Sequence, residues 1–249
     1  MASGDQDRSK CCFLEWMKLQ ERDLSELLQA LTLTPQNDAE LTKLAQKAIE
    51  HFESYISQRS SLSRNDVASF FSPSWCTPWE NSLFWIAGCR PSAFIRLIYA
   101  LDGADIESKL SEILRGKTVG DIGDLSARQM RAVDELQRRT IREEERLTAR
   151  LAGLQEDVAD QPISAIAKGV DRIGEMSGEI EKVLNEHEQS MAEVLEEADK
   201  LRLNTLKEIL GILRPVQGVE FLAMSKKLHL CVHEWSKKRD QNKHDIENH

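Results

Sequence analysis

Glycine and proline are scarce in this sequence, at 12 and 6 of 249 residues, and phenylalanine is hardly more frequent, at 7. Residues with β-branched side chains are seldom clustered, which counts against a β-sheet protein. Leucine, glutamate, alanine, lysine and arginine, which all favour helices, dominate instead. We therefore expect an all-α fold, a multi-helix bundle with long antiparallel helices.

Long apolar runs are missing as well. No stretch approaches the roughly 20 apolar residues that span a bilayer. The first thirty residues carry acids and bases among their apolar positions, unlike a secretion signal. We expect neither a membrane span nor export, and we expect the protein in the nucleus and cytoplasm.

The cysteines are odd in number, and their spacing matches no zinc ribbon. Without an export signal, we expect them to be reduced thiols that are mostly buried. The five are Cys11, Cys12, Cys76, Cys89 and Cys231.

Positive charge is in deficit, because the formal net charge is −9. A protein that neutralises many phosphates carries a basic face. We therefore expect no direct binding to nucleic acid. Hydrophobic residues at 41% and charged residues at 30% fit a folded protein whose long helices have solvated faces.

Catalytic signatures are absent too. The sequence contains no G-x-G-x-x-G, Walker A, H-E-x-x-H, G-x-S-x-G or kinase motif. Its many carboxylates are typical of solvated helix surfaces rather than of tuned acids and bases. We expect a protein that acts by binding other molecules and is not an enzyme.

Apolar residues at three- and four-residue steps predict a first helix over residues 10–33 and a second from Asp38. Thr34-Pro35 separates them, because proline cannot continue a helical hydrogen-bond ladder. The two helices fit an antiparallel hairpin. Residues 1–9 are expected to be disordered.

The segment Thr77-Pro78-Trp79-Glu80 predicts a helix start, with a capping threonine, a first-turn proline and a glutamate placed for a capping box. We expect this helix to end at Gly88. Three of the five tryptophans lie between Trp75 and Trp85, and Arg90 is the only basic residue over 65–95. A stacking platform for nucleic acid needs interleaved basic residues, so we interpret the cluster as a rigid aromatic core.

In the second half, Ser126 and Gln129 predict the capped start of a long helix that reaches Val158. We interpret its charged centre, residues 138–146, as a solvated face with i,i+4 ion pairs. Glycines within 116–123 predict a loop, and 116–125 is where the domain would be sub-divided.

Another very long helix is expected from Ser177 to Pro215, followed by a last helix over 216–240 and a flexible tail over 241–249. The long helices are expected to pair into a bundle or a coiled-coil hairpin, within one subunit or through self-association.

His229 and His233 lie four residues apart in the predicted last helix, so they project from one face as neighbours. The apolar stripe through Phe221, Leu228, Val232 and Trp235 lies about 100° around the axis from them. We therefore expect both rings to be half-buried at the edge of that stripe.

The histidine pair has two interpretations. Both residues pack and hydrogen-bond at the boundary of the core, as such pairs commonly do, or they coordinate a transition metal or haem iron through neutral imidazole nitrogen. Two histidines on one helical face do not readily occupy opposite axial positions of one iron. One would then ligate, and the other would assist or substitute.

The segments 75–92 and 226–235 together resemble the delay-of-germination (DOG) family of plant regulators. The likeness extends in the family's order over nearly the whole chain, so we expect a DOG-type helical domain over residues 10–240. Further matching stretches are Phe13-Leu-Glu-Trp-Met17, Leu154-Gln-Glu-Asp157, Ile209-Leu-Gly-Ile-Leu213 and Pro215-Val-Gln-Gly218.

The resemblance implies a role in seed dormancy, germination and abscisic-acid signalling through contact with type-2C protein phosphatases. An N-terminal aromatic motif is implicated in that contact, and it corresponds here to Phe13, Leu14, Glu15 and Trp16. The resemblance also implies haem binding by the paired histidines, which gives His229 and His233 as ligands. Neither role adds catalysis.

The aromatic motif has two physical interpretations. An amphipathic helix can dock in a partner's groove, with Trp16 as the hot spot. Phe13 and Trp16 can equally close the bundle's own core, and only the resemblance favours binding.

The DOG-type domain also follows a basic leucine-zipper segment in TGA-type transcription factors. We expect no room for that segment here, because helical DOG-like sequence begins near residue 10. An alternative function is therefore a transcriptional cofactor or dimerisation module that pairs with TGA-type leucine-zipper factors through its long helices.

Overall fold

The computed structural model describes residues 2–33, 37–113, 125–160, 162–169 and 178–247. Over these residues the protein is helical and has no strand, apart from an isolated bridge between Trp85 and Gly88. None of the described helices is long and apolar enough to cross a membrane. The helices are α1 (Ala2–Thr32), α2 (Asp38–Ser63), α3 (Ala68–Phe71), α4 (Pro78–Asn81), α5 (Ser92–Ile113), α6 (Ala127–Asp157), α7 (Ile163–Gly169), α8 (Gly178–Ile212) and α9 (Pro215–Glu247).

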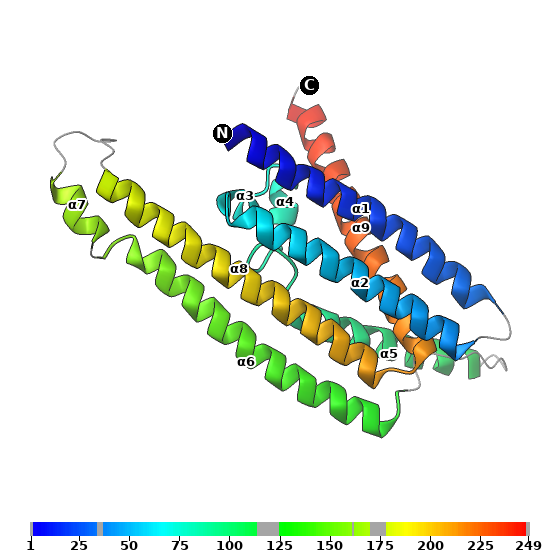
Figure 1. Cartoon of the computed structure of the whole chain (residues 1–249). Helices are drawn as coiled ribbons and strands as arrows, with labels where there is room; N and C mark the ends of the chain where they lie inside the picture. Colours follow the sequence, from blue (N-terminus) through cyan, green and yellow to red (C-terminus); the bar gives the residue numbers. More distant parts are fainter. Residues whose placement is uncertain (1, 34–36, 114–124, 161, 170–177, 248–249) are drawn as a thin grey trace.

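The long helices lie antiparallel, which confirms the predicted multi-helix bundle (Figure 1). Helices α1 and α2 form one hairpin, and α6 and α8 form a second hairpin within the chain. Helix α9 packs along both α1 and α2, and the start of α1 lies at the same end of the molecule as the end of α9. The first and last long helices therefore share a surface.

A single hydrophobic core joins these helices. Helices α1, α2, α5, α6, α8 and α9 each contribute a fully buried side chain to it. In chain order these are Leu27, Ile49, Ile95, Leu136, Ile209 and Phe221. Burying apolar area in this way drives association of the helices at roughly 25 cal/mol per Å². A second cluster of Phe13, Trp16, Met17 and Cys76 lies between α1 and the segment before α4.

The local signals for helix starts are confirmed. Ser126 and Gln129 form a capping box at the start of α6, and Thr77 caps α4 with Pro78 in its first turn. Helix α4 ends at Asn81 rather than at Gly88, because the chain turns there into a loop that buried arginines hold. Helix α5 continues from Ser92 through Gly103 to Ile113.

Disorder is expected at the two ends of the chain, and the described residues there belong to helices. Helix α1 begins at Ala2, and α9 continues to Glu247. The N-terminal turn has partners that the sequence does not reveal, because the Gln6 amide donates to Ser74 Oγ at 3.1 Å and Ser9 is buried. The loop expected over 116–123 lies outside the described residues.

The charged centre of α6 is only partly a solvated face. Glu144 is buried and accepts hydrogen bonds from Arg90 Nε at 2.7 Å and from the Ser92 amide at 2.6 Å. Elsewhere the run makes ion pairs with α8, among them Arg139–Glu208 at 2.6 Å. The pairs within α6 have i,i+3 spacing rather than the expected i,i+4 spacing. The run therefore fastens α6 to α8 and to the start of α5.

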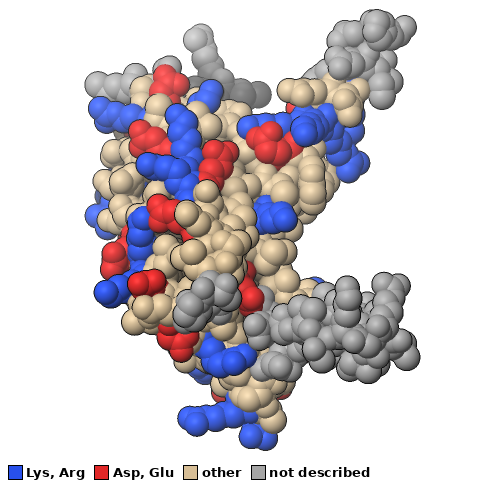
Figure 2. All heavy atoms as spheres, turned by 90° about the vertical axis from the view of Figure 1, so that its right-hand side faces the viewer, with Lys and Arg blue, Asp and Glu red and all other residues tan. Residues whose placement is uncertain are grey.

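Acidic and basic side chains are interspersed on the surface. The face drawn in Figure 2 has both kinds side by side and no continuous basic field. This distribution agrees with the net charge of −9.

Two buried arginines hold the loop between α4 and α5. Arg202 Nη1 pairs with Asp199 Oδ1 at 2.6 Å, and Arg59 Nε lies 3.4 Å from Asp199 Oδ2. The remaining Arg202 donors reach the carbonyls of Trp85 at 2.6 Å, Ile86 at 2.9 Å and Cys89 at 2.7 Å.

These contacts impose an unusual backbone on the loop. Ile86 and Ala87 have φ of 44° and 56°, a region that β-branched residues rarely adopt. A Cβ atom at Gly88 would lie 3.1 Å from Arg202 Cζ, so any other residue would require the guanidinium to shift slightly. We call Arg59, Asp199 and Arg202 the arginine clamp.

We expect Arg202→Met to destabilise the protein by about 3–5 kcal/mol, because it leaves buried carbonyls and part of Asp199 without donors. Arg139→Met is the matched control, since it removes an exposed ion pair of α6 and α8 and costs at most about 1 kcal/mol. Urea unfolding followed by circular dichroism measures both. Equal losses in the two variants would contradict the role given to the clamp.

Candidate functional site

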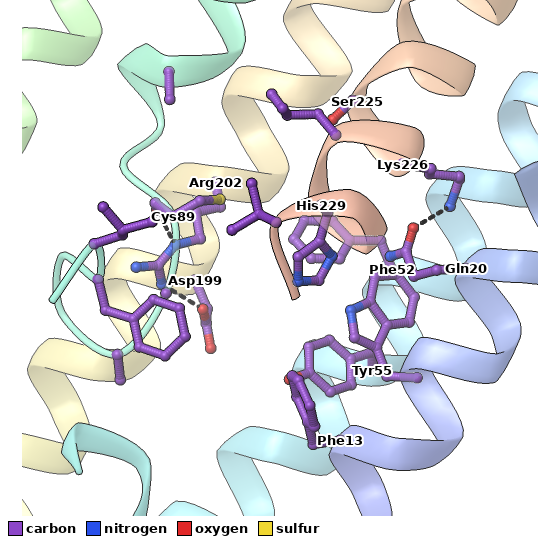
Figure 3. Close-up of a pocket in the computed structure, with 18 of the residues that line it drawn as sticks. Phe13, Gln20, Phe52, Tyr55, Cys89, Asp199, Arg202, Ser225, Lys226 and His229 are labelled. Atoms are coloured by element: carbon purple, nitrogen blue, oxygen red, sulfur yellow. Dashed lines mark hydrogen bonds and ion pairs between the residues drawn. The ribbon is translucent and has the colours of Figure 1, made fainter. Parts of the chain in front are cut away.

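A cavity of about 390 Å³ lies between α1, α2, α8, α9 and the clamped loop. Its lining is mainly apolar and aromatic. Figure 3 shows Phe13 and Tyr55 on one side, the Arg202–Asp199 pair on the other, and His229 between them. The size lies within the range of about 300–1,000 Å³ that is typical of small-molecule and cofactor sites.

The aromatic wall is formed by α1, α2 and the segment before α4. The Trp16 indole stacks on Tyr55, with ring centroids 4.6 Å apart and planes inclined by 7°. Phe52 lies 5.6 Å from the same indole, and Phe13 lies 6.3 Å from Trp75. Burial raises the pKa of Tyr55 to about 12, so its hydroxyl stays neutral.

The cations that border the cavity already have partners. Arg59 and Arg202 share Asp199. Lys226 Nζ lies 2.8 Å from Asp23 Oδ2 and 5.4 Å from the centre of the Trp16 ring. Burial lowers the pKa of Lys226, and Asp23 opposes that change.

His229 is different, because its ring is directed from α9 into the cavity (Figure 3). Burial, assisted by the neighbouring His233 and Lys226, lowers its pKa to about 4 although Glu80 opposes the shift. The imidazole is therefore neutral at physiological pH and keeps a nitrogen lone pair for a ligand.

His233 has another environment. It is 3% exposed, and its Nδ1 lies 2.9 Å from Glu80 Oε2. The edge of its ring faces Phe13, with centroids 5.5 Å apart. Burial raises the pKa of Glu80, but the bond to His233 and the charges of both histidines outweigh burial and lower it. The two histidines are neighbours, as expected, yet only His229 lines the cavity.

The expectation for the histidines and the apolar stripe holds only in part, because His229 is half-buried as expected, whereas His233 is fully buried. Leu228 and Trp235, which were to form the buried stripe, are 47% and 59% exposed. His233 is buried instead, because Glu80 supplies a charged partner that offsets the desolvation of its ring. Sequence spacing on α9 could not reveal this partner, which lies 153 positions earlier.

The N-terminal motif is divided between two faces of α1. Phe13 and Trp16 are 8% and 6% exposed, so they belong to the core. Leu14 is 40% exposed and Glu15 is also exposed. Of the four motif residues, only Leu14 and Glu15 lie on the surface, so Trp16 is not accessible as a hot spot.

Sequence reasoning missed the residues that complete the site. Glu80 was expected to cap its own helix, but its carboxylate turns inward to His233. The expectation of mostly buried cysteines is also wrong. Cys12 and Cys76 are buried, Cys231 is intermediate, and Cys11 and Cys89 are exposed, all as free thiols.

Comparison with known proteins gives a consistent set of relatives. The family model DOG1, described as seed dormancy control, matches residues 23–100. The chain is 41% identical to Protein DOG1-like 1 of Arabidopsis thaliana, over 93% of this chain and 90% of that protein. It is 38% identical to Protein DOG1-like 3 of the same plant, over 96% and 88%.

Two more distant relatives come from the same plant. Protein RESPONSE TO ABA AND SALT 1 is 25% identical, over 92% of this chain and 93% of that protein. Transcription factor TGA6 is 23% identical, and the match covers 89% of this chain but 59% of that protein.

Replacing His229 should reduce the decrease in the free energy of unfolding that occurs at acidic pH. The unfolded state binds a proton near pH 6.5, whereas the folded state does so only near pH 4. Stability therefore falls as pH drops between these values, by about 1–2 kcal/mol at pH 5. We expect the His229→Leu variant to lack this pH-dependent loss. Urea unfolding at pH 7 and at pH 5 measures the free energy of unfolding of both proteins. Parallel profiles for the variant and the natural protein would contradict the low pKa.

Proposed function

Because the chain belongs to the DOG1 seed-dormancy family, we propose that it is a non-catalytic regulator of dormancy and abscisic-acid signalling that holds haem and binds type-2C protein phosphatases. The observation that carries the proposal is the neutral His229 imidazole, directed into an aromatic cavity. Such a nitrogen is a common ligand of haem iron.

The residues present fit haem in two respects. His229 offers a ligand atom that no hydrogen bond in the described structure occupies. Phe13, Phe52 and the Trp16–Tyr55 stack provide apolar surface for a porphyrin.

His233 does not act as an equal second ligand in this proposal. Its Nδ1 is engaged by Glu80, and its ring is packed against Phe13 outside the cavity lining. Its contribution is to position α9 and to tune His229 electrostatically. Bound haem would supply an iron centre that responds to redox state or to small gaseous ligands.

Helix α1 links the cavity to the proposed phosphatase surface. Phe13 and Trp16 form part of the cavity wall, while Leu14 and Glu15 of the same helical turns face outward. A ligand that repacks the inner face therefore acts on the element that carries the outer one. Helices α6 and α8 pair with each other within the chain, so no specific observation favours the alternative of pairing with TGA-type factors.

We expect hemin to give a sharp Soret shift with the purified protein, because the His229 nitrogen ligates the iron. His229→Leu should remove the shift. His187→Leu, a matched change on α8 away from the cavity, should keep it. An unaltered spectrum in the His229→Leu protein would reject this ligand.

For the phosphatase, the test is a pull-down with plant type-2C enzymes. Leu14→Ala/Glu15→Lys should weaken capture by about tenfold, as expected when an exposed anchor and a charge are lost. Leu28→Ala is the matched control, since Leu28 is an exposed leucine of the same helix at 46%. Undiminished capture by the double variant would exclude this surface. Substitutions at Phe13 and Trp16 would not test it, because both side chains are buried and their loss would affect folding.

A further inference from the structure

A second cluster of potential ligands lies beside the cavity and is not part of the haem proposal. Cys76 Sγ, a Glu80 carboxylate oxygen and a His233 ring nitrogen all lie within 4.8 Å of one another. Their residues are 8%, 2% and 3% exposed. We propose that Cys76, Glu80 and His233 form a binding site for a zinc ion.

The donor set matches the chemistry of zinc. Thiolate sulfur, carboxylate oxygen and imidazole nitrogen are its three protein ligands, with bonds of about 2.0–2.3 Å in a tetrahedral arrangement. Donors around such an ion are about 3.3–3.7 Å apart by that geometry. The Nδ1 of His233 lies 2.9 Å from Glu80 Oε2, and Cys76 Sγ lies within 4.8 Å of the ligand atoms of both residues. Small side-chain rotations suffice to open the site around an ion.

Charge favours the ion as well. A thiolate, a carboxylate and a neutral imidazole carry two negative charges together, so Zn²⁺ makes the buried cluster neutral. Without a metal, burial and the neighbouring Glu80 raise the pKa of the Cys76 thiol, and the thiol stays protonated. On binding, the ion takes the place of the thiol proton, which is released to solvent.

The surroundings hold two of the ligands in place. Thr77 and Pro78 between Cys76 and Glu80 form the capped start of α4, and Asn81 Nδ2 donates to the Pro73 carbonyl at 3.1 Å. Ser236 Oγ donates to the His233 carbonyl at 2.7 Å and lies 3.4 Å from Glu80 Oε2. Outer contacts of this kind orient metal ligands.

The site has an entrance and is separable from haem. Cys76 and Glu80 line the large cavity, so an ion can reach them from that side. The three ligands leave a fourth tetrahedral position, which a water molecule can fill. His229 is not one of the three, so its replacement distinguishes the two sites.

Cobalt(II) is the probe, because it occupies zinc sites and absorbs light. Titration of the full-length protein should give one equivalent of bound cobalt, a thiolate-to-cobalt charge-transfer band and visible d–d bands that Zn²⁺ abolishes. Cys76→Ser should lose the charge-transfer band and weaken zinc binding beyond the about 10–100-fold that is typical of an outer-shell change.

Two control variants separate this site from other thiols and from haem. Cys12→Ser removes another buried cysteine, which is hydrogen-bonded to Gln58, and should leave the cobalt spectrum unchanged. His229→Leu should also leave it unchanged while it removes the hemin signal. Loss of the cobalt spectrum in either control would contradict the assignment.

A measurement on the natural protein remains decisive if Cys76→Ser fails to fold. Zinc should slow alkylation of Cys76 by iodoacetamide at least tenfold and leave Cys12 unaffected, as read by mass spectrometry. Equal rates at Cys76 with and without zinc, or an absent charge-transfer band, would overturn the proposal.

Discussion

The buried carboxylate of Asp199 is the constraint on which the site depends. It neutralises Arg59 and Arg202 in the interior, where unpaired charge would be strongly unfavourable. Because Arg202 has more donors than Asp199 can satisfy, the rest bind the carbonyls of Trp85, Ile86 and Cys89. One charge cluster thus fastens α2 and α8 to a loop and maintains one wall of the cavity.

His229 differs from these cations, because its ring lines the cavity and forms no hydrogen bond with the described residues. The cations around the cavity have acidic or aromatic partners, whereas burial keeps the His229 ring uncharged. One turn further along α9, His233 faces Glu80 and Cys76 instead. A single helix therefore places two histidines in two chemically different environments, and Phe13 of α1 contacts both.

Local sequence signals predicted the helices and their starts well. The Ser126 capping box and the Thr77 cap depend on side chains within three positions of the groups that they bind, so a sequence contains all the information that they need. The assignment of buried faces was less successful. Leu228 and Trp235 were expected inside and are exposed, while Glu144 was expected outside and is buried, because ionic partners from distant segments offset the cost of burying charge.

The sequence by itself determined that the chain is all-α, where several of its long helices start and stop, and that it belongs to the DOG1 family. Periodicity, caps and family motifs are local in the chain, so they can be recognised without the tertiary structure. Only the tertiary structure decided which residues share a site. Glu80 and His233 lie 153 positions apart, and Arg202 and Trp85 lie 117 apart. Such pairs meet only when the whole bundle has packed, and their energy comes from desolvation and charge that exist only in that packed state.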